Sequence, residues 1–264
     1  MKQSKWNILL ILLLGISLAG NIALSARILQ PTAQSSDVTL QEKPEAATDE
    51  DITSAQNTTA SDTEETAYNT DYDFHSNAQY DERLSIFELN HSQADVIFAG
   101  DSITQKYLVN EFFPDVNLLN RGIGSDVSAG LLDRMDEILS HDPNKIFILI
   151  GINDIGKTIS PDDTISNVSQ CLQLCNDQNI QVYLISILPV VELEGQEYND
   201  EVIALNQQYK ALCDSQNVTY LDLYDSFLNE DGSVNADNYG PDGVHLNANG
   251  YTILSDFLSS YIYQ

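Results

Sequence analysis

Basic residues are scarce in this sequence. The chain of 264 residues has 11 Lys and Arg against 40 Asp and Glu, which gives a formal net charge of −29. Nucleic-acid binding depends on clustered Lys and Arg that neutralise phosphates, and anionic lipid headgroups attract the same side chains. The composition therefore argues against a nucleic-acid partner and against docking of the protein on anionic lipid.

Sequence motifs of several enzyme classes are also missing. Gly122 and Gly124 begin like a dinucleotide-binding loop, but Val127 stands where its third glycine is needed. The α/β-hydrolase nucleophile elbow requires Gly-x-Ser-x-Gly, and Thr104 takes the place of the second glycine. The dinucleotide-binding loop and the α/β-hydrolase elbow are therefore disfavoured.

Cysteine is rare, and no cysteine has a histidine near it in the sequence. Zinc sites need clustered His and Cys ligands, so neither a metal nor a cofactor is expected. We expect the cysteines to be buried as small apolar residues. Outside the cell two of them could form a disulfide, which would leave one thiol free. The residues are Cys171, Cys175 and Cys213.

The N-terminus has the pattern of a membrane-directed segment. Lys2 and Lys5 precede an apolar run over residues 8–24, a length between the ~20 residues of a spanning helix and the ~7–15 of a signal-peptide core. We expect residues 1–29 to be a signal-anchor, with a cleaved signal peptide as the alternative. The lysine pair predicts a cytoplasmic N-terminus, with the rest of the chain outside the cytoplasm, either membrane-anchored or secreted.

Residues 30–78 are rich in Thr, Ser, Ala, Asp, Glu and Gln and contain few large apolar side chains. Such a segment buries too little surface to offset the entropy of ordering it, and its acidic groups repel one another. We expect a disordered acidic tether, followed by a folded domain over residues 79–264.

From residue 80 onward, short apolar runs alternate with helical patterns. Strands are predicted over residues 94–99, 116–120, 145–150, 181–187 and 218–221. Helices are predicted over residues 80–89, 127–139, 164–178, 197–215 and 247–261. This alternation indicates a parallel sheet covered on both faces. The predicted fold is therefore α/β, with three α/β/α layers and a five-stranded parallel sheet.

Polar motifs lie next to the predicted strands and the last helix. They are Gly100–Ile103, Asn120–Asp126, Gly151–Asp154 and Asp242–His245. Each of them alone is a weak signal, common in turns and helix entries. Because sites in open parallel sheets form at the carboxyl ends of the strands, we expect the four motifs to converge on one rim of the sheet.

Together, the motifs contain the parts of a nucleophilic acyl-transfer site. Ser102 needs a base to take its proton, and His245 is the histidine within a rim motif. Asp242 lies close enough in sequence to orient that imidazole. The developing oxyanion needs fixed donors, which the Ser102 amide, an amide of the loop 122–125 and the Asn153 side chain would supply.

At this point the sequence resembles the SGNH, or GDSL-type, serine hydrolases. The resemblance covers residues from about 80 to 264, and the four motifs occur in the order of that family. It implies a flavodoxin-like SGNH hydrolase fold and an ester hydrolase whose catalytic triad is Ser102, Asp242 and His245.

The resemblance also implies an oxyanion hole made by Ser102, Ser125 and Asn153. One departure concerns Ser125, because the family usually has a glycine at this place. A backbone N–H survives the change, but a serine lacks the φ freedom of glycine. Gly124 is the reserve donor.

For the substrate, the resemblance implies carboxylic esters, often short acyl groups on sugars or lipids. The predicted location favours an acetyl esterase that acts on O-acylated carbohydrate. A lysophospholipase or a thioesterase-like acyl hydrolase is the alternative, and a non-catalytic surface-tethered binding module is an alternative of another class. Loops 155–165 and 188–200 are expected to line the substrate pocket.

Overall fold

Five short parallel strands form the centre of the structure, a computed structural model that describes residues 67–191 and 198–264. The strands are β1 (Val96–Gly100), β2 (Leu118–Gly122), β3 (Lys145–Leu149), β4 (Gln181–Ile185) and β5 (Thr219–Leu221). Their order in the sheet is β2-β1-β3-β4-β5, which is the flavodoxin-like order. The predicted five-stranded parallel sheet is confirmed.

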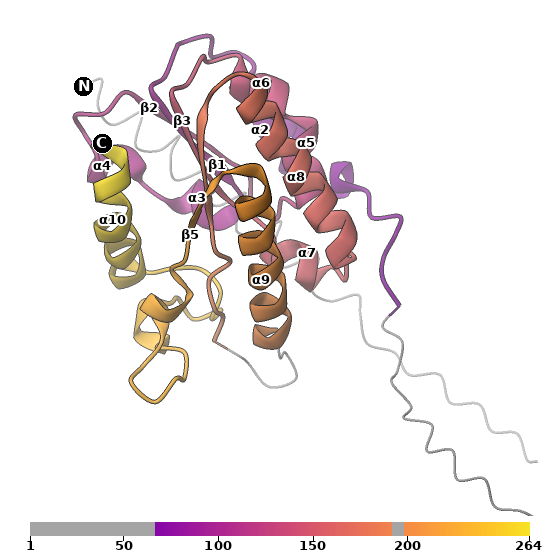
Figure 1. Cartoon of the computed structure of the whole chain (residues 1–264), viewed down its shortest axis with the longest axis vertical. Helices are drawn as coiled ribbons and strands as arrows, with labels where there is room; N and C mark the ends of the chain where they lie inside the picture. The colour runs from indigo at the N-terminus through magenta and orange to yellow at the C-terminus, as the bar shows by residue number, and fades with distance from the viewer. Residues whose placement is uncertain (1–66, 192–197) are drawn as a thin grey trace, which may run out of the picture. The chain divides into compact units, whose positions relative to one another are not determined.

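The central strands are apolar apart from the first residues of β3 and β4, because both of their faces are buried. In β1, Ile97 and Ala99 pack into one layer of the core, whereas Val96 and Phe98 pack into the other. This alternation follows from the two-residue repeat of a strand. The sheet is therefore the middle of three layers, as predicted (Figure 1).

Helices cover both faces of the sheet. One face carries α5 (Ser128–Asp133), α6 (Met135–Leu139), α8 (Pro161–Asp177) and α9 (Asn199–Gln216). The other face carries α3 (Ser102–Lys106), α4 (Val109–Phe112) and α10 (Ala248–Ile262). In Figure 1, α10 and α4 lie to the left of the strands, and α8 and α9 lie to the right.

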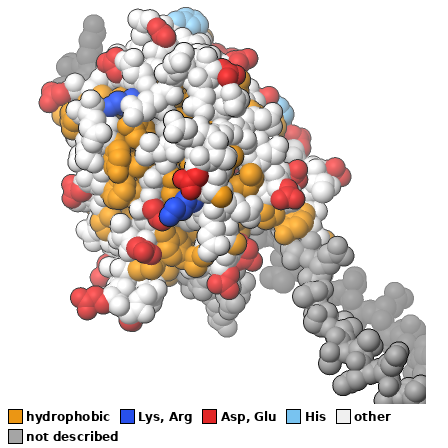
Figure 2. All heavy atoms as spheres, viewed as in Figure 1, with side chains coloured by type: hydrophobic (Ala, Val, Ile, Leu, Met, Phe, Trp, Pro, Cys, Tyr) orange, Lys and Arg blue, Asp and Glu red, His pale blue; other side chains and the backbone are white. Residues whose placement is uncertain are grey.

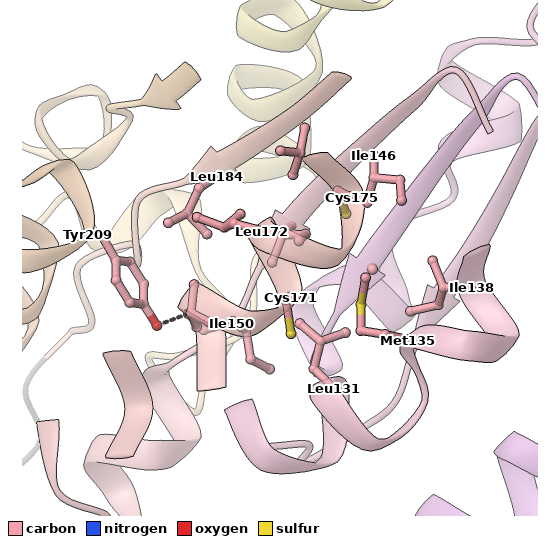
Figure 3. Close-up of a cluster of buried hydrophobic side chains, with 14 of the residues drawn as sticks. Leu131, Met135, Ile138, Ile146, Ile150, Cys171, Leu172, Cys175, Leu184 and Tyr209 are labelled. Atoms are coloured by element: carbon pink, nitrogen blue, oxygen red, sulfur yellow. Dashed lines mark hydrogen bonds between the residues drawn. The ribbon is translucent and has the colours of Figure 1, made fainter. Parts of the chain in front are cut away.

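The first of these layers holds the cysteines. Figure 3 shows Cys171 and Cys175 on α8 among the apolar side chains of α5, α6 and the strands. All three cysteines are free and buried, and burial raises the pKa of the Cys175 thiol to about 12. They serve as small apolar core residues, as expected from the sequence.

Shorter elements complete the described part of the chain. Helix α2 (Tyr80–Phe87) precedes β1, and α7 (Ile152–Gly156) follows β3. Three 3₁₀ turns are η1 (Phe74–Ser76), η2 (Tyr224–Phe227) and η3 (Ala236–Asn238). The short helices α3, α4 and α7 were not predicted, because four or five residues are too few to show a helical repeat.

The predicted helix over residues 127–139 is wrong in one respect, because it is two helices. Arg134 separates α5 from α6 with φ −100° and ψ 11°. Its side chain turns inward and is only 1% exposed. Nε and Nη2 donate to Asp126 Oδ2 at 3.0 and 2.9 Å. The break therefore falls at the residue whose guanidinium reaches the ends of the strands.

Two backbone carbonyls complete the partners of Arg134. Nη1 donates to Arg121 O at 2.7 Å, and Nη2 donates to Gly100 O at 3.1 Å. Arg121 lies in β2, and Gly100 ends β1. One buried cation thus holds the ends of two neighbouring strands and Asp126 together.

The predicted N-terminal segment, residues 1–29, lies outside the described residues, as does most of the predicted tether. Within residues 67–191 and 198–264, none of the helices combines the length and apolar character needed to cross a membrane. The described end of the tether contacts the domain. Asn69 N donates to Thr158 O at 2.8 Å, and Lys157 Nζ lies 5.3 Å from the centroid of the Tyr72 ring.

Replacement of Arg134 by methionine should destabilise the domain strongly. Removing one partner of a buried ion pair leaves an uncompensated charge, here on Asp126, which typically costs about 3–5 kcal/mol. Urea unfolding of Arg134→Met would measure this loss. Adding Asp126→Asn to that variant should recover part of it, because the stranded carboxylate is removed. A loss below about 1 kcal/mol for Arg134→Met would contradict this account.

Candidate active site

Ser102 is the first residue of α3, directly after the end of β1. The helix begins there because Asp101 caps it, with Asp101 Oδ1 accepting from Ile103 N at 2.9 Å. Gly100 adopts φ +152°, and a side chain at this position would run into the carbonyl of Leu149. The sharp turn from strand to helix thus brings Ser102 to the carboxyl end of the sheet.

A continuous hydrogen-bonded chain runs from Ser102 to Asp242. His245 Nε2 lies 2.8 Å from Ser102 Oγ, and His245 Nδ1 lies 2.7 Å from Asp242 Oδ2. Ser102 and His245 are 143 residues apart in sequence. The fold therefore brings together the three residues that the sequence predicts as a triad.

Asp242 accepts several hydrogen bonds within its own loop. The backbone N–H groups of Val244 and His245 donate to Asp242 Oδ1 at 3.1 and 2.9 Å. Partial burial disfavours the charged form, but the hydrogen bonds from the His245 ring and from these two amides outweigh it and lower the pKa of Asp242 to about 2. The carboxylate is therefore ionised at neutral pH.

The loop that carries Asp242 and His245 is closed by a bond within its own backbone and is joined to the segment after β4. Gly240 N donates to His245 O at 2.8 Å, and Val191 N, after β4, donates to Gly243 O at 2.8 Å. Gly243 has φ +70°, a conformation that glycine adopts without strain. These bonds fix the position of the imidazole relative to α3.

The loop after β2 contains a tight turn. Asp126 N donates to Ile123 O at 3.2 Å, which closes a β-turn with Gly124 and Ser125 in the centre. Ser125 has φ +59°, whereas Gly124 does not have a positive φ. A positive φ at the second central residue is the mark of a type II turn, which favours glycine there. The question raised by Ser125 is answered by the structure, because the serine itself takes the glycine conformation.

Asn153 lies on α7, directly after β3, and meets this turn. Its Nδ2 donates to Asp126 O at 2.9 Å, so one of its two amide hydrogens holds the side chain in place. The helix α7 is itself fixed by Asp154, whose carboxylate accepts from Ser128 N at 3.1 Å and from Thr164 Oγ1 at 3.2 Å. The predicted oxyanion donors Ser102, Ser125 and Asn153 thus come from loops after three neighbouring strands.

Each of these three loops buries an aspartate behind the predicted catalytic groups. Asp101, Asp126 and Asp154 are at most 1% exposed. Burial raises the pKa of Asp101 to about 7, and the nearby acids Asp126 and Asp154 add to this against the backbone hydrogen bond from Ile103. Burial also raises the pKa values of Asp126 and Asp154 to about 6, against hydrogen bonds from Arg134 and Ser128 respectively.

A cavity of about 350 Å³ borders the helix that carries Asn153. Its walls come from α7 and the start of α8, from α9, and from Tyr68 of the segment before the domain. Part of the predicted pocket loop 155–165 lines it, together with Tyr198 at the end of the predicted loop 188–200. The lining residues named here are Tyr68, Ile155, Thr158, Ile159, Tyr198 and Glu201.

The sequence did not reveal two residues that support the site, Arg134 and Asn77. Asn77 lies before the domain boundary predicted at residue 79, and its Nδ2 donates to Gly124 O at 2.7 Å. Both side chains act on backbone carbonyls, which carry no sequence signature. An arginine within the apolar pattern of residues 131–138 was the one available signal. In the described part of the chain, no group of three or more His, Cys, Asp or Glu side chains is placed to hold a metal ion.

A flavodoxin-like parallel sheet binds its ligands at the carboxyl ends of the strands, where the strand order reverses, and Ser102 lies there, after β1. The model of the GDSL-like lipase/acylhydrolase family matches residues 98–253. The chain belongs to this family, the SGNH hydrolases, as its sequence motifs predicted. The description of this family names lipases and acylhydrolases.

Two groups of curated relatives match part of the chain. The isoamyl acetate-hydrolyzing esterase of Saccharomyces cerevisiae is 26% identical over 173 residues, which cover 59% of this chain and 72% of the relative. The N-acylneuraminate cytidylyltransferase of Streptococcus agalactiae serotype V is 25% identical over 158 residues, or 60% of this chain. The chain spans only about a third, 36%, of the length of that cytidylyltransferase.

Solved structures share the fold. A GDSL-like lipase from Bacteroides thetaiotaomicron superimposes with a TM-score of 0.62 at 23% identity, over 70% of this chain and 97% of that one. An acetyl xylan esterase superimposes with a TM-score of 0.55 at 26% identity, over 63% of this chain and 98% of that one.

The buried Asp101 should make stability depend on pH. Burial raises its pKa from the ordinary 3.8 to about 7 in the folded state, so the folded state binds the proton more tightly. This contribution to stability is full below about pH 4 and is lost as the pH rises through about 7. Asp101→Asn should therefore have a shallower decline of the melting midpoint between pH 5 and 8, by about 2–4 °C. Thermal unfolding over this range would measure it.

Asp136→Asn, at an exposed position on α6, is the matched control and should leave the slope unchanged. Equal slopes for wild type and Asp101→Asn would contradict the assignment.

Proposed function

We propose that the chain is an extracytoplasmic serine esterase that removes short acyl groups, acetyl above all, from O-acylated carbohydrate. The observation that carries the chemistry is the hydrogen-bonded chain from Ser102 Oγ through His245 to Asp242, with distances of 2.8 and 2.7 Å. The proposed location rests on the pattern of residues 1–29.

In the proposed reaction, His245 removes the proton of Ser102 as Oγ attacks the ester carbonyl carbon. A tetrahedral intermediate forms, and His245 then protonates the leaving alcohol as the C–O bond breaks. Water, activated by the same imidazole, hydrolyses the acyl-enzyme and releases the carboxylic acid. Asp242 holds the ring with Nδ1 protonated and stabilises the imidazolium, a role for which its lowered pKa of about 2 is suited.

The oxyanion of the intermediate is stabilised by three donors in this proposal. They are the amides of Ser102 and Ser125 and the side chain of Asn153, whose Nδ2 also donates to Asp126 O. Ser102 N lies at the start of α3, so the helix dipole adds a favourable field. Gly124 remains the reserve donor, because its amide belongs to the same turn.

The acetyl group is supported by two relatives. One is named an isoamyl acetate-hydrolyzing esterase and the other an acetyl xylan esterase, so both names specify acetate esters. Surface charge supports an uncharged substrate over an anionic lipid. Figure 2 shows Asp and Glu side chains spread over the visible face with few Lys and Arg between them, and such a surface does not attract anions.

The cavity beside α7 is a place for the alcohol part of the substrate. Tyr68 and Tyr198 line it together with polar groups such as Thr158 and Glu201. Aromatic faces combined with hydrogen-bonding groups suit a sugar ring, which has apolar CH faces and polar hydroxyls. Ile155, which also lines the cavity, lies two residues after Asn153.

Hydrolysis of an activated acetate ester by the full-length protein tests the chemistry. Ser102→Ala should abolish hydrolysis, because no other group can form the acyl-enzyme. Asn153→Ala should fold normally and lower kcat by about 10²–10³. Full kcat in Asn153→Ala would remove it from the oxyanion hole. Wild-type activity no higher than that of folded Ser102→Ala would favour the alternative, a non-catalytic binding module.

Tyr68→Ala tests the sugar-binding role of the cavity. An aromatic contact of this kind corresponds to about a three- to tenfold change in affinity. We expect KM to rise by that factor for an O-acetylated oligosaccharide and to stay constant for a small activated acetate. Tyr263→Ala is the matched control, because Tyr263 is also an exposed tyrosine, at 60%, and lines a different cavity.

An unchanged KM in Tyr68→Ala would contradict the proposed sugar contact. The same assays with esters of increasing acyl length separate the remaining alternatives. A rate that rises toward long acyl chains, with lysophospholipid as a good substrate, would favour a lysophospholipase, and preference for acyl thioesters would favour a thioesterase-like hydrolase.

A further inference from the structure

A β-turn such as that over residues 123–126 can take one of two common forms, which differ in the direction of one amide. Types I and II differ at ψ of the first central residue and φ of the second, which amounts to a flip of the peptide between them. Here that peptide joins Gly124 and Ser125. Because N–H and C=O of a trans peptide point in opposite directions, a flip would reverse the Ser125 N–H, the proposed oxyanion donor.

Ser125 by itself does not favour the form that the structure has. A residue other than glycine in the left-handed region costs about 1–3 kcal/mol, and Ser125 has φ +59°. A type I turn accepts serine at this position without that cost. Its own conformational preference therefore favours the flipped peptide, and another contact has to oppose it.

Asn77 makes that contact. Its Nδ2 donates to Gly124 O at 2.7 Å, so the hydrogen bond holds the carbonyl half of the peptide that could flip. Asn77 is itself held, because its Oδ1 accepts from Gln79 N at 3.1 Å and its backbone O accepts from Tyr80 N at 2.9 Å. A flipped peptide would lose this bond and present its N–H to the amide of Asn77.

Neighbouring residues strengthen the same contact. Arg83 Nε donates to Gly122 O at 3.1 Å, and the buried Tyr80 donates from its hydroxyl to Gly130 O at 2.7 Å. Tyr80 packs with Ile123 in a small separate apolar cluster. The segment 77–83 thus bonds to the chain before and after the turn, at Gly122 and Gly130. This segment lies before the residues matched by the family model, 98–253.

We infer that Asn77 is a positioning residue of the oxyanion hole: it holds the Gly124–Ser125 peptide in its type II orientation and thereby aims the Ser125 amide at the reacting carbonyl. This role rests on the proposed function of the site. It also explains how this chain uses a serine where glycine would need no support, since the cost of the serine is offset by a hydrogen bond from outside the motif.

The test compares Asn77→Asp with Asn90→Asp in the full-length protein, with an activated acetate ester as substrate. Asn77→Asp keeps the acceptor for Gln79 N but removes the donor to Gly124 O. Asn90 uses its Oδ1 as an acceptor within its own turn, from Ser92 N at 2.9 Å, so its aspartate should leave kcat unchanged. Asn77→Asp should lower kcat about tenfold with KM within about twofold, because the lost interaction acts in the transition state.

Ser125→Gly provides the second arm. With glycine at this position the type II turn carries no strain, so Ser125→Gly alone should keep or raise kcat and thermal stability. In that background Asn77→Asp should lower kcat by less than about threefold, because glycine, unlike serine, does not favour the flipped peptide. A merely structural role for Asn77 would instead give equal costs in both backgrounds, together with a lowered melting midpoint.

Three results would overturn the inference: unchanged kcat in Asn77→Asp, equal costs in the two backgrounds, or a tenfold loss of kcat in Ser125→Gly alone. The last measurement does not involve Asn77, so it decides the matter even if Asn77→Asp does not fold. Loss of activity in Ser102→Ala with full activity in Asn77→Asp would reject this inference and leave the proposed function intact. Full activity in Ser102→Ala would reject both.

Discussion

The buried guanidinium of Arg134 holds the geometry on which the site depends. It bonds to the carbonyl of Gly100, at the end of β1, to the carbonyl of Arg121 in β2, and to the carboxylate of Asp126. Strand ends have unpaired carbonyls once the sheet ladder stops, and buried carbonyls need partners. The guanidinium of Arg134 is a planar cation with five N–H donors, so a single side chain can bond to several of these carbonyls. The nucleophile turn and the oxyanion turn are therefore fixed relative to each other before any substrate binds.

The strand order explains why such a device is needed here. The chain leaves β1 toward β2 on one side of the sheet and leaves β3 toward β4 on the other, so the loops after β1 and β3 diverge and open a crevice. Ser102 and Asn153 lie at these two loops, and His245 reaches them from the loop before α10. Polar groups converge there with little secondary structure to hold them. The buried aspartates Asp126 and Asp154 hold these groups in place, because Asp126 bonds to Arg134 and Asp154 bonds to Ser128.

The sequence predicted the parts of the site better than their supports. Ser102, Asp242 and His245 were identified because their chemistry demands particular side chains in motifs beside particular elements, and the apolar runs gave the strands to within two residues. Asn77 escaped because its partner in the turn is a backbone carbonyl, which any residue offers. Arg134 escaped because two of its partners are also carbonyls and nothing in the sequence marks Asp126 as the third. The break at Arg134 escaped for a related reason: periodicity reports which face is apolar, and both halves of residues 127–139 keep that face toward the sheet.

Composition also set the domain boundary at residue 79, where the acidic tether was expected to end. Asn77 and Tyr80 lie on either side of this boundary, and both donate to the segment 122–130. A polar stretch with few large aliphatic side chains predicts little burial but cannot reveal one hydrogen bond to a strained turn. The serine at position 125 gives that bond its importance, because glycine there would hold the turn unaided. Ser125 inside the motif and the hydrogen bond from Asn77 outside it thus belong together. A domain cut at residue 79 would keep the strained serine and lose the asparagine that offsets the strain.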